Sequence, residues 1–219
     1  RTKYLTKNTV GYSLNAFIDY SDPLDILSHL LIGAEGTLGF IAEAVMETVP
    51  DYPFKSTAFI YFETIYSACQ AIGPLTESGA EAVELMDRAS LRSIEDLKGA
   101  PAILKTLPET AAALLVEYQS NSKEELQAKI DSLLPHASSF LLLEPISFTE
   151  DPYIQAFYWK LRKGMFPAVG AVRASGTTVI LEDIAFPVAT LGDAILDLHV
   201  LLEKYEYENA IIFGHAKDG

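Results

Sequence analysis

The sequence predicts an α+β fold, in which an antiparallel β-sheet with flanking helices follows the last piece of a different domain. Short segments rich in aromatic and β-branched residues alternate with amphipathic segments that are long enough to cross between strands. The run Pro50-Asp51-Tyr52-Pro53 breaks every periodic element and marks a boundary. Of the 219 residues, 49% are hydrophobic, so the chain can bury a core of its own.

The part before the boundary predicts one helix, one loop and one strand. The helix is expected over residues 23–32, because Pro23 is favoured at a first helical position and the preceding Ser21-Asp22 pair offers a cap. A glycine-rich loop follows over residues 33–39. Alternating apolar and polar side chains then predict a strand over residues 40–49.

The part after the boundary predicts two successive strand–helix–strand units. Asp87 and Ser122 are each placed to cap a helix, and Glu125 matches a capping box with Ser122. Four strands with crossover helices close most simply as a ferredoxin-like βαβ–βαβ sheet with helices on one face. The strands are expected at residues 56–63, 82–86, 113–119 and 138–143, and the helices at residues 65–72, 87–97 and 122–134, with a loop or short helix over 99–109.

A third unit completes the chain. The pattern predicts a long helix over residues 149–165, a strand over 177–184 and a second helix over 187–205. A last apolar strand over residues 209–213 leads directly into Gly214-His215.

Charge and composition exclude several kinds of partner. The formal net charge of −14 repels nucleic acid and anionic lipid. No stretch of about 18 residues is free of charge, so no transmembrane helix is expected. The single cysteine, Cys69, is most typical of a small core side chain and suits a reducing compartment. We therefore expect a cytoplasmic protein, with at most a peripheral attachment to a membrane in its intact form.

Glycines recur at every third position from Gly33 to Gly39. Glycine allows positive φ and lets a ligand touch the backbone, and successive N–H groups of such a loop can form a nest for an anion. The Thr37 hydroxyl adds a donor. However, the order helix, loop, strand differs from that of Rossmann and Walker loops. Spacing alone therefore favours a tight structural turn over a phosphate site.

Five short segments match, in chain order, the motifs of one known superfamily. They are Lys7-Asn8-Thr9-Val10-Gly11-Tyr12 (K-N-x-x-G-Y), Gly33-Ala34-Glu35-Gly36-Thr37-Leu38-Gly39 (G-x-E-G-T-L-G), Trp159-Lys160-Leu161-Arg162 (W-x-L-R), Glu182-Asp183 with Pro187 (a strand-to-helix junction), and Gly214-His215-Ala216-Lys217-Asp218-Gly219 (the start of G-H-x-x-D-G-N-x-H). By these segments the chain resembles the FAD-linked oxidases of the vanillyl-alcohol oxidase and D-lactate dehydrogenase superfamily. The run over residues 162–170 is most similar to its bacterial D-lactate-dehydrogenase-like members.

The resemblance implies a flavoprotein with FAD as its cofactor. It makes residues 1–50 the C-terminal end of an FAD-binding domain and residues 51–219 a substrate-binding cap domain that is truncated at its C-terminus. Because the chain starts without Met and stops within a motif, we expect a longer protein, and we expect this chain by itself to be inactive. The residues implied to contact the cofactor are Gly11, Tyr12, Gly33, Glu35, Gly36, Thr37 and Gly39.

Two residues are candidates for contact with a substrate. Arg162 is a fixed cation suited to a bidentate hold on a carboxylate, although most arginines are surface or ion-pair residues. His215 follows an apolar strand, where a histidine can accept a proton, bind a metal or be an ordinary solvated residue. The resemblance implies that Arg162 binds substrate and that His215 is catalytic, with His215 also a ligand of a divalent metal such as zinc. The second histidine of the motif would follow Gly219, so the metal site is incomplete here, and metal binding is expected to be weak or absent.

The activity that the resemblance implies is the FAD-dependent oxidation of a 2-hydroxy acid to the 2-oxo acid, with hydride transfer to the flavin. Phe166 and Leu181 stand where the D-2-hydroxyglutarate branch has a threonine and a lysine, which favours a monocarboxylic substrate such as lactate or glycolate. The electron acceptor, a quinone or an electron carrier, is not specified. Two alternatives stay open: a non-catalytic α+β module that binds a small ligand, and a flavoprotein of another reaction class.

Overall fold

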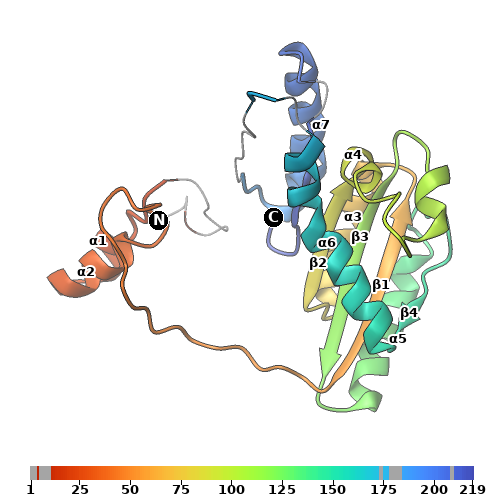
Figure 1. Cartoon of the computed structure of the whole chain (residues 1–219). Coiled ribbons are helices and arrows are strands. Elements are labelled where there is room, and N and C mark those ends of the chain that lie inside the picture. The colour runs from red at the N-terminus through yellow and green to blue at the C-terminus, as the bar shows by residue number, and fades with distance from the viewer. Residues whose placement is uncertain (1–3, 5–10, 173–174, 178–183, 208–209) are drawn as a thin grey trace. The chain divides into compact units, whose positions relative to one another are not determined.

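The computed structural model describes residues 4, 11–172, 175–177, 184–207 and 210–219. The chain divides into two compact units (Figure 1). The first unit comprises residues 1–51, 181–187 and 219, and the second comprises residues 52–180 and 188–218. Among the described helices, none combines the length and the apolar composition that a membrane crossing requires.

The first unit contains two short helices, α1 (Ala16–Asp19) and α2 (Pro23–Leu30). The predicted cap of α2 is confirmed, because the Asp22 carboxylate accepts the backbone N–H groups of Leu24 and Asp25. The helix ends two residues earlier than predicted, and two tight turns carry the chain through the glycine loop.

The strand predicted over residues 40–49 is wrong. The segment has no regular secondary structure, and the Phe40 and Val45 side chains are 92% and 97% exposed. A strand is held by hydrogen bonds to a neighbour, and among the described residues this segment pairs with none. The alternating pattern therefore suits a strand, but the pattern alone does not supply the neighbouring strand that a sheet requires.

The second unit is built on a five-stranded sheet with the order β4-β1-β3-β2-β5, in which every neighbouring pair is antiparallel. The order of the first four strands is that of a ferredoxin-like βαβ–βαβ fold, so the predicted α+β class is confirmed. A fifth strand extends the sheet beside β2. The strands are β1 (Phe54–Phe62), β2 (Ala82–Asp87), β3 (Ala112–Ser120), β4 (Phe148–Thr149) and β5 (Phe213–His215).

Helices cover both faces of this sheet, and not one face as predicted (Figure 1). Side chains alternate along β1, so Phe59 and Tyr61 pack with Leu161 and Met165 of α6, while the residues between them face α3 and α5. Helix α7 packs on α3. The helices are α3 (Ile65–Glu77), α4 (Arg88–Arg92), α5 (Lys123–Ala137), α6 (Pro152–Val172) and α7 (Val188–Lys204), with a 3₁₀ turn η2 (Ala102–Thr106).

Several predicted boundaries need correction. The strand predicted over residues 138–143 is a turn in which only Leu142 bridges to β1, and the fourth strand is Phe148–Thr149. The helix predicted from residue 149 starts at Pro152, because the Asp151 carboxylate caps it. The helix capped by Asp87 ends at Arg92, and the last strand is shifted to Phe213–His215. Of the strand predicted over residues 177–184, the part from 178 to 183 lies outside the described residues.

Candidate active site

Polar side chains on successive turns attach helix α6 to the sheet: Gln155 donates to the backbone carbonyls of Lys55 and Thr149, and Trp159 and Arg162 contact glutamates on the strands. Trp159 and Arg162 are three positions apart, so they project from the same face of the helix. The indole N–H of Trp159 donates to Glu117 Oε2 over 2.6 Å, and Arg162 contacts Glu84 on the neighbouring strand. The three-residue spacing of Trp159 and Arg162 therefore lets one face of α6 reach two adjacent strands, β3 through Glu117 and β2 through Glu84.

Glu84 is shared between Arg162 and His215. Its Oε2 atom accepts from Arg162 Nε at 3.1 Å and lies 3.0 Å from Nη2, and its Oε1 atom lies 2.5 Å from His215 Nδ1. The register of β2 and β5 places Glu84 directly opposite His215. Cross-strand neighbours of this kind have adjacent side chains, so the sheet itself brings the two residues together.

The three side chains differ in their access to solvent. The Glu84 and Arg162 side chains are 5% and 13% exposed, whereas the His215 side chain is 74% exposed. An ionised carboxylate only accepts hydrogen bonds, so the contact favours the tautomer with the proton on Nδ1 and leaves Nε2 as an acceptor. The Arg162 guanidinium also lies 4.7 Å from the centre of the Phe213 ring. The cluster thus presents one accessible imidazole above a buried ion pair.

A second glutamate on the same face of the sheet has a different set of partners. Glu117 accepts from Thr57 Oγ1 at 3.1 Å, from Trp159 and from Gln119 Nε2 at 2.6 Å. These donors are neutral, and Glu117 is 6% exposed. Its role is to hold α6 on the sheet.

The residues predicted to contact a cofactor come together within the first unit. The Tyr12 hydroxyl lies 2.9 Å from Thr37 Oγ1, and a Cβ atom on Gly33 would lie 3.5 Å from the Gly11 carbonyl oxygen. Gly33 and Gly36 have φ of +76° and +77°, which favours glycine.

Every residue of the glycine loop over 33–39 is exposed except Ala34, which is buried. Glu35, Gly36 and Gly39 are therefore accessible, and a Cβ atom added to Gly36 would meet none of the described residues within 4 Å. An open backbone of this kind fits a ligand that lies against it, such as the flavin nucleotide that the resemblance implies.

The described residues do not fit a metal ion. Within the ranges that the structure covers, no group of three or more histidine, cysteine, aspartate or glutamate side chains is arranged to hold one. Among these described residues, the carboxylate that contacts His215 is that of Glu84, and Arg162 already balances its charge. Glu182 and Asp183, which the sequence also singled out, lie outside the described residues.

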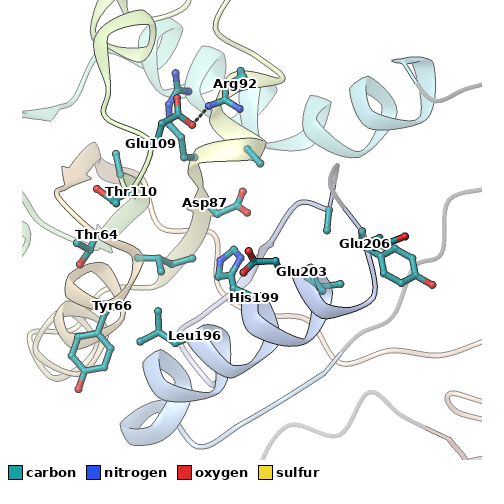
Figure 2. Close-up of a pocket in the computed structure, with 17 residues that line it drawn as sticks. Thr64, Tyr66, Asp87, Arg92, Glu109, Thr110, Leu196, His199, Glu203 and Glu206 are labelled. Atoms are coloured by element: carbon teal, nitrogen blue, oxygen red, sulfur yellow. Dashed lines mark hydrogen bonds and ion pairs between the residues drawn. The ribbon is translucent and has the colours of Figure 1, made fainter.

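The opposite face of the sheet contains a cavity of about 900 Å³ between α3, α4 and α7 (Figure 2). The Asp87 carboxylate in its wall accepts the backbone N–H groups of Ser90 and Ile212, at 2.7 and 2.9 Å. Burial raises the pKa of the Asp87 carboxyl group. Arg92 and Glu109 pair with each other at the rim. These polar groups serve the local structure, and the cavity is separate from the Glu84 cluster.

The sequence singles out Arg162 and His215 as candidates but does not single out Glu84. A signal was present, because Glu84 interrupts the apolar run Val83, Leu85 and Met86 in a segment that predicts a buried strand. A charge in such a position needs a partner. Glu117 interrupts β3 in the same way.

Several known proteins are similar in sequence to this chain. The chain is 27% identical to "Glycolate oxidase subunit GlcD" of Bacillus subtilis over 220 residues, which cover 98% of this chain and 41% of the relative. It is 26% identical to "D-lactate dehydrogenase" of Anaerostipes hadrus, with 98% and 42% covered, and 24% identical to "D-2-hydroxyglutarate dehydrogenase" of Pseudomonas putida, with 98% and 22% covered. The chain therefore spans about two fifths or less of the length of these relatives.

The family model described as "FAD linked oxidases, C-terminal domain" matches residues 53–219. This match covers the whole sheet, helix α6 and the three residues of the Glu84 cluster. The chain belongs to the family of FAD linked oxidases, C-terminal domain.

Proposed function

We propose that the full-length protein is a flavin-dependent dehydrogenase that oxidises a 2-hydroxy acid to the 2-oxo acid. The observation that carries the proposal is that one buried carboxylate, Glu84, holds both Arg162 and His215. The relatives are named for glycolate, D-lactate and D-2-hydroxyglutarate, which all have a carboxylate next to a hydroxyl group. A cation beside a proton acceptor matches that pair of groups.

Arg162 binds the carboxylate of the substrate in this proposal. Its guanidinium is held in place by Glu84 on one edge and by Phe213 on one face, so little side-chain entropy is lost when a ligand binds. A charge-assisted hydrogen bond to a carboxylate is among the stronger polar contacts. The carboxylate thereby orients the adjacent hydroxyl group.

His215 accepts the hydroxyl proton of the substrate through Nε2 as the α-hydrogen leaves. In the neutral imidazole, the contact from Nδ1 to Glu84 favours the proton on Nδ1 and leaves Nε2 as the acceptor, and the exposed ring can reach a ligand. FAD, the cofactor that the family implies, supplies the hydride acceptor. We propose that residues 1–50 are the end of the FAD-binding domain and that residues 51–219 are the substrate-binding cap.

The cofactor would lie against the exposed glycine loop of the first unit. Tyr12 and Thr37 are already joined by their hydroxyl groups, and Gly33 packs against the Gly11 carbonyl. We propose that Gly11, Tyr12, Gly33, Glu35, Gly36, Thr37 and Gly39 contact FAD.

The proposed substrate is a monocarboxylic acid such as glycolate or lactate. Glu84 already balances the charge of Arg162, and the chain has a formal net charge of −14. A second carboxylate on the substrate would have to approach against that field.

Anaerobic reduction of the flavin tests this function in the full-length protein. We expect glycolate or D-lactate to bleach the bound flavin faster than D-2-hydroxyglutarate does, with steady turnover when a dye acceptor is added. His215→Ala should lower turnover by about 10²-fold or more, because a positioned base contributes about 10²–10⁴-fold. If the protein binds no flavin, or if none of the three acids bleaches it, the proposed function is wrong. A ligand-binding module would keep its affinity for the acid in the His215→Ala variant without any turnover in the wild type.

A further inference from the structure

Glu84 lies at the centre of the proposed site, and its side chain is buried. Each oxygen of its carboxylate contacts a different proposed substrate-binding group: Oε2 contacts Arg162 and Oε1 contacts His215. The carboxylate sits on β2, between β3 and β5, so the backbone on both sides is fixed by hydrogen bonds.

The contact with Glu84 determines which edge of Arg162 remains available. Nε and Nη2 both meet Glu84 Oε2, and the Phe213 ring lies 4.7 Å from the guanidinium carbon on one face. Among the described residues, Nη1 has no hydrogen-bond partner. The end of the guanidinium formed by Nη1 and the second N–H of Nη2 is therefore the edge left for a ligand carboxylate.

The same contact determines the tautomer of His215. A neutral imidazole has one donor nitrogen and one acceptor nitrogen, and its partners decide which is which. Since Nδ1 lies 2.5 Å from a carboxylate oxygen, which only accepts, the neutral ring is expected to have its proton on Nδ1 and its lone pair on Nε2.

We infer that Glu84 is the positioning residue of the site: it sets the tautomer of His215 and limits Arg162 to an end-on contact with the substrate carboxylate. This inference rests on the proposed function for its kinetic consequences. Its structural consequence, the tautomer of His215, can be measured whether or not the protein turns over a hydroxy acid.

Glu117 provides a matched control. It is also a buried glutamate on the same face of the sheet, one strand away, and it also contacts a residue of the W-x-L-R segment. Its partners are the neutral donors of Thr57, Trp159 and Gln119. Glu117→Gln keeps a side-chain carbonyl oxygen that can accept from Trp159, so α6 should stay attached and the groups that meet the substrate should not change.

The test compares Glu84→Gln, Glu84→Asp and Glu117→Gln in the full-length holoprotein, with rates normalised to bound flavin. An amide at position 84 must turn its NH₂ group either toward His215 or toward Arg162. The first orientation reverses the tautomer and lowers kcat, and the second displaces Arg162 and raises KM. We expect kcat/KM of Glu84→Gln to fall by about 10²-fold or more, as misplacement of reacting groups by about 1 Å does elsewhere. Glu117→Gln should stay within about threefold of the wild type.

Glu84→Asp keeps the charge but is one methylene shorter, so it can reach one partner and not both. We expect its kcat/KM to lie between those of the wild type and Glu84→Gln.

Nitrogen-15 spectra of histidine-labelled protein, recorded well above the usual histidine pKa, report the tautomer directly. The His215 signal, identified by its loss in His215→Gln, should show a protonated Nδ1 in the wild type and in Glu117→Gln.

Each outcome separates the inference from the proposed function. Suppose that no hydroxy acid reduces the flavin of the wild type, but that His215 has a protonated Nδ1 in the wild type and not in Glu84→Gln. The proposed function is then wrong, and the positioning role of Glu84 stands. If the wild type is active and Glu84→Gln or Glu84→Asp matches Glu117→Gln in kcat, KM and tautomer, the inference about Glu84 is wrong.

Discussion

Two buried glutamates lie under the same helix, on adjacent strands, and they differ in the side chains that they contact. Glu84 faces a cation and a largely exposed histidine. Glu117 faces three neutral donors, one of them from the same helix that supplies the cation for Glu84. In burial the two are nearly alike.

The comparison shows that burial of a carboxylate does not mark an active site. A buried carboxylate is tolerated wherever enough donors surround it, and three hydrogen bonds satisfy Glu117. What distinguishes Glu84 is that, within the part of the chain that the structure describes, each of its partners keeps a nitrogen without a hydrogen bond: Nη1 of Arg162 and Nε2 of His215. The predictions below test this difference by removing one partner at a time.

Removal of the cation should have the largest effect on stability. In Arg162→Met, Glu84 is left buried without a countercharge, and the loss of one member of a buried pair costs about 3–5 kcal/mol. Urea unfolding of the chain, followed by circular dichroism, measures the free energy of unfolding. The double variant Arg162→Met/Glu84→Gln should recover at least half of the loss. A fall of less than about 1 kcal/mol in the single variant would show that Glu84 does not depend on Arg162.

Removal of the indole donor should have an intermediate effect on stability and almost none on catalysis. Trp159→Phe keeps most of the ring but removes the hydrogen bond to Glu117, and a bond to a charged group contributes about 1.5–3 kcal/mol. The same unfolding measurement checks this value. In the full-length protein, turnover for each bound flavin should be unchanged. A large drop in turnover would mean that Trp159 also acts on the substrate site.

Removal of the imidazole should have the smallest effect on stability. The His215 side chain is 74% exposed, so its hydrogen bond to Glu84 forms largely in water and contributes only about 0.5–1.5 kcal/mol. We therefore expect the melting temperature of the His215→Ala chain to lie within a few degrees of the wild type, in contrast to its large effect on turnover. Strong destabilisation would make His215 a structural residue like Trp159.

The sequence predicts the elements whose cause is local. The aromatic and β-branched run of β1, the Asp22 and Ser122 caps and the ferredoxin-like succession all follow from neighbours in the chain. The strand expected over residues 40–49 fails because a strand depends on a partner, and the chain's alternating pattern does not supply one.

The site is predicted only in part for the same reason. Arg162 and His215 are recognisable by the segments in which they lie, but Glu84 and His215 are 131 residues apart along the chain. Only the pairing of β2 with β5 brings them together. The β5 strand itself was expected a few residues earlier, so its register with β2 was out of reach of sequence reasoning.

A crystal structure of the full-length protein with FAD and a bound 2-oxo acid tests the central claim most directly. We expect the carboxylate of the ligand within hydrogen-bond distance of Arg162 Nη1, its oxo group facing His215 Nε2, and Glu84 still in contact with both residues. A ligand bound beside the flavin with its carboxylate on other residues, or a flavin remote from the glycine loop of the first unit, would contradict it.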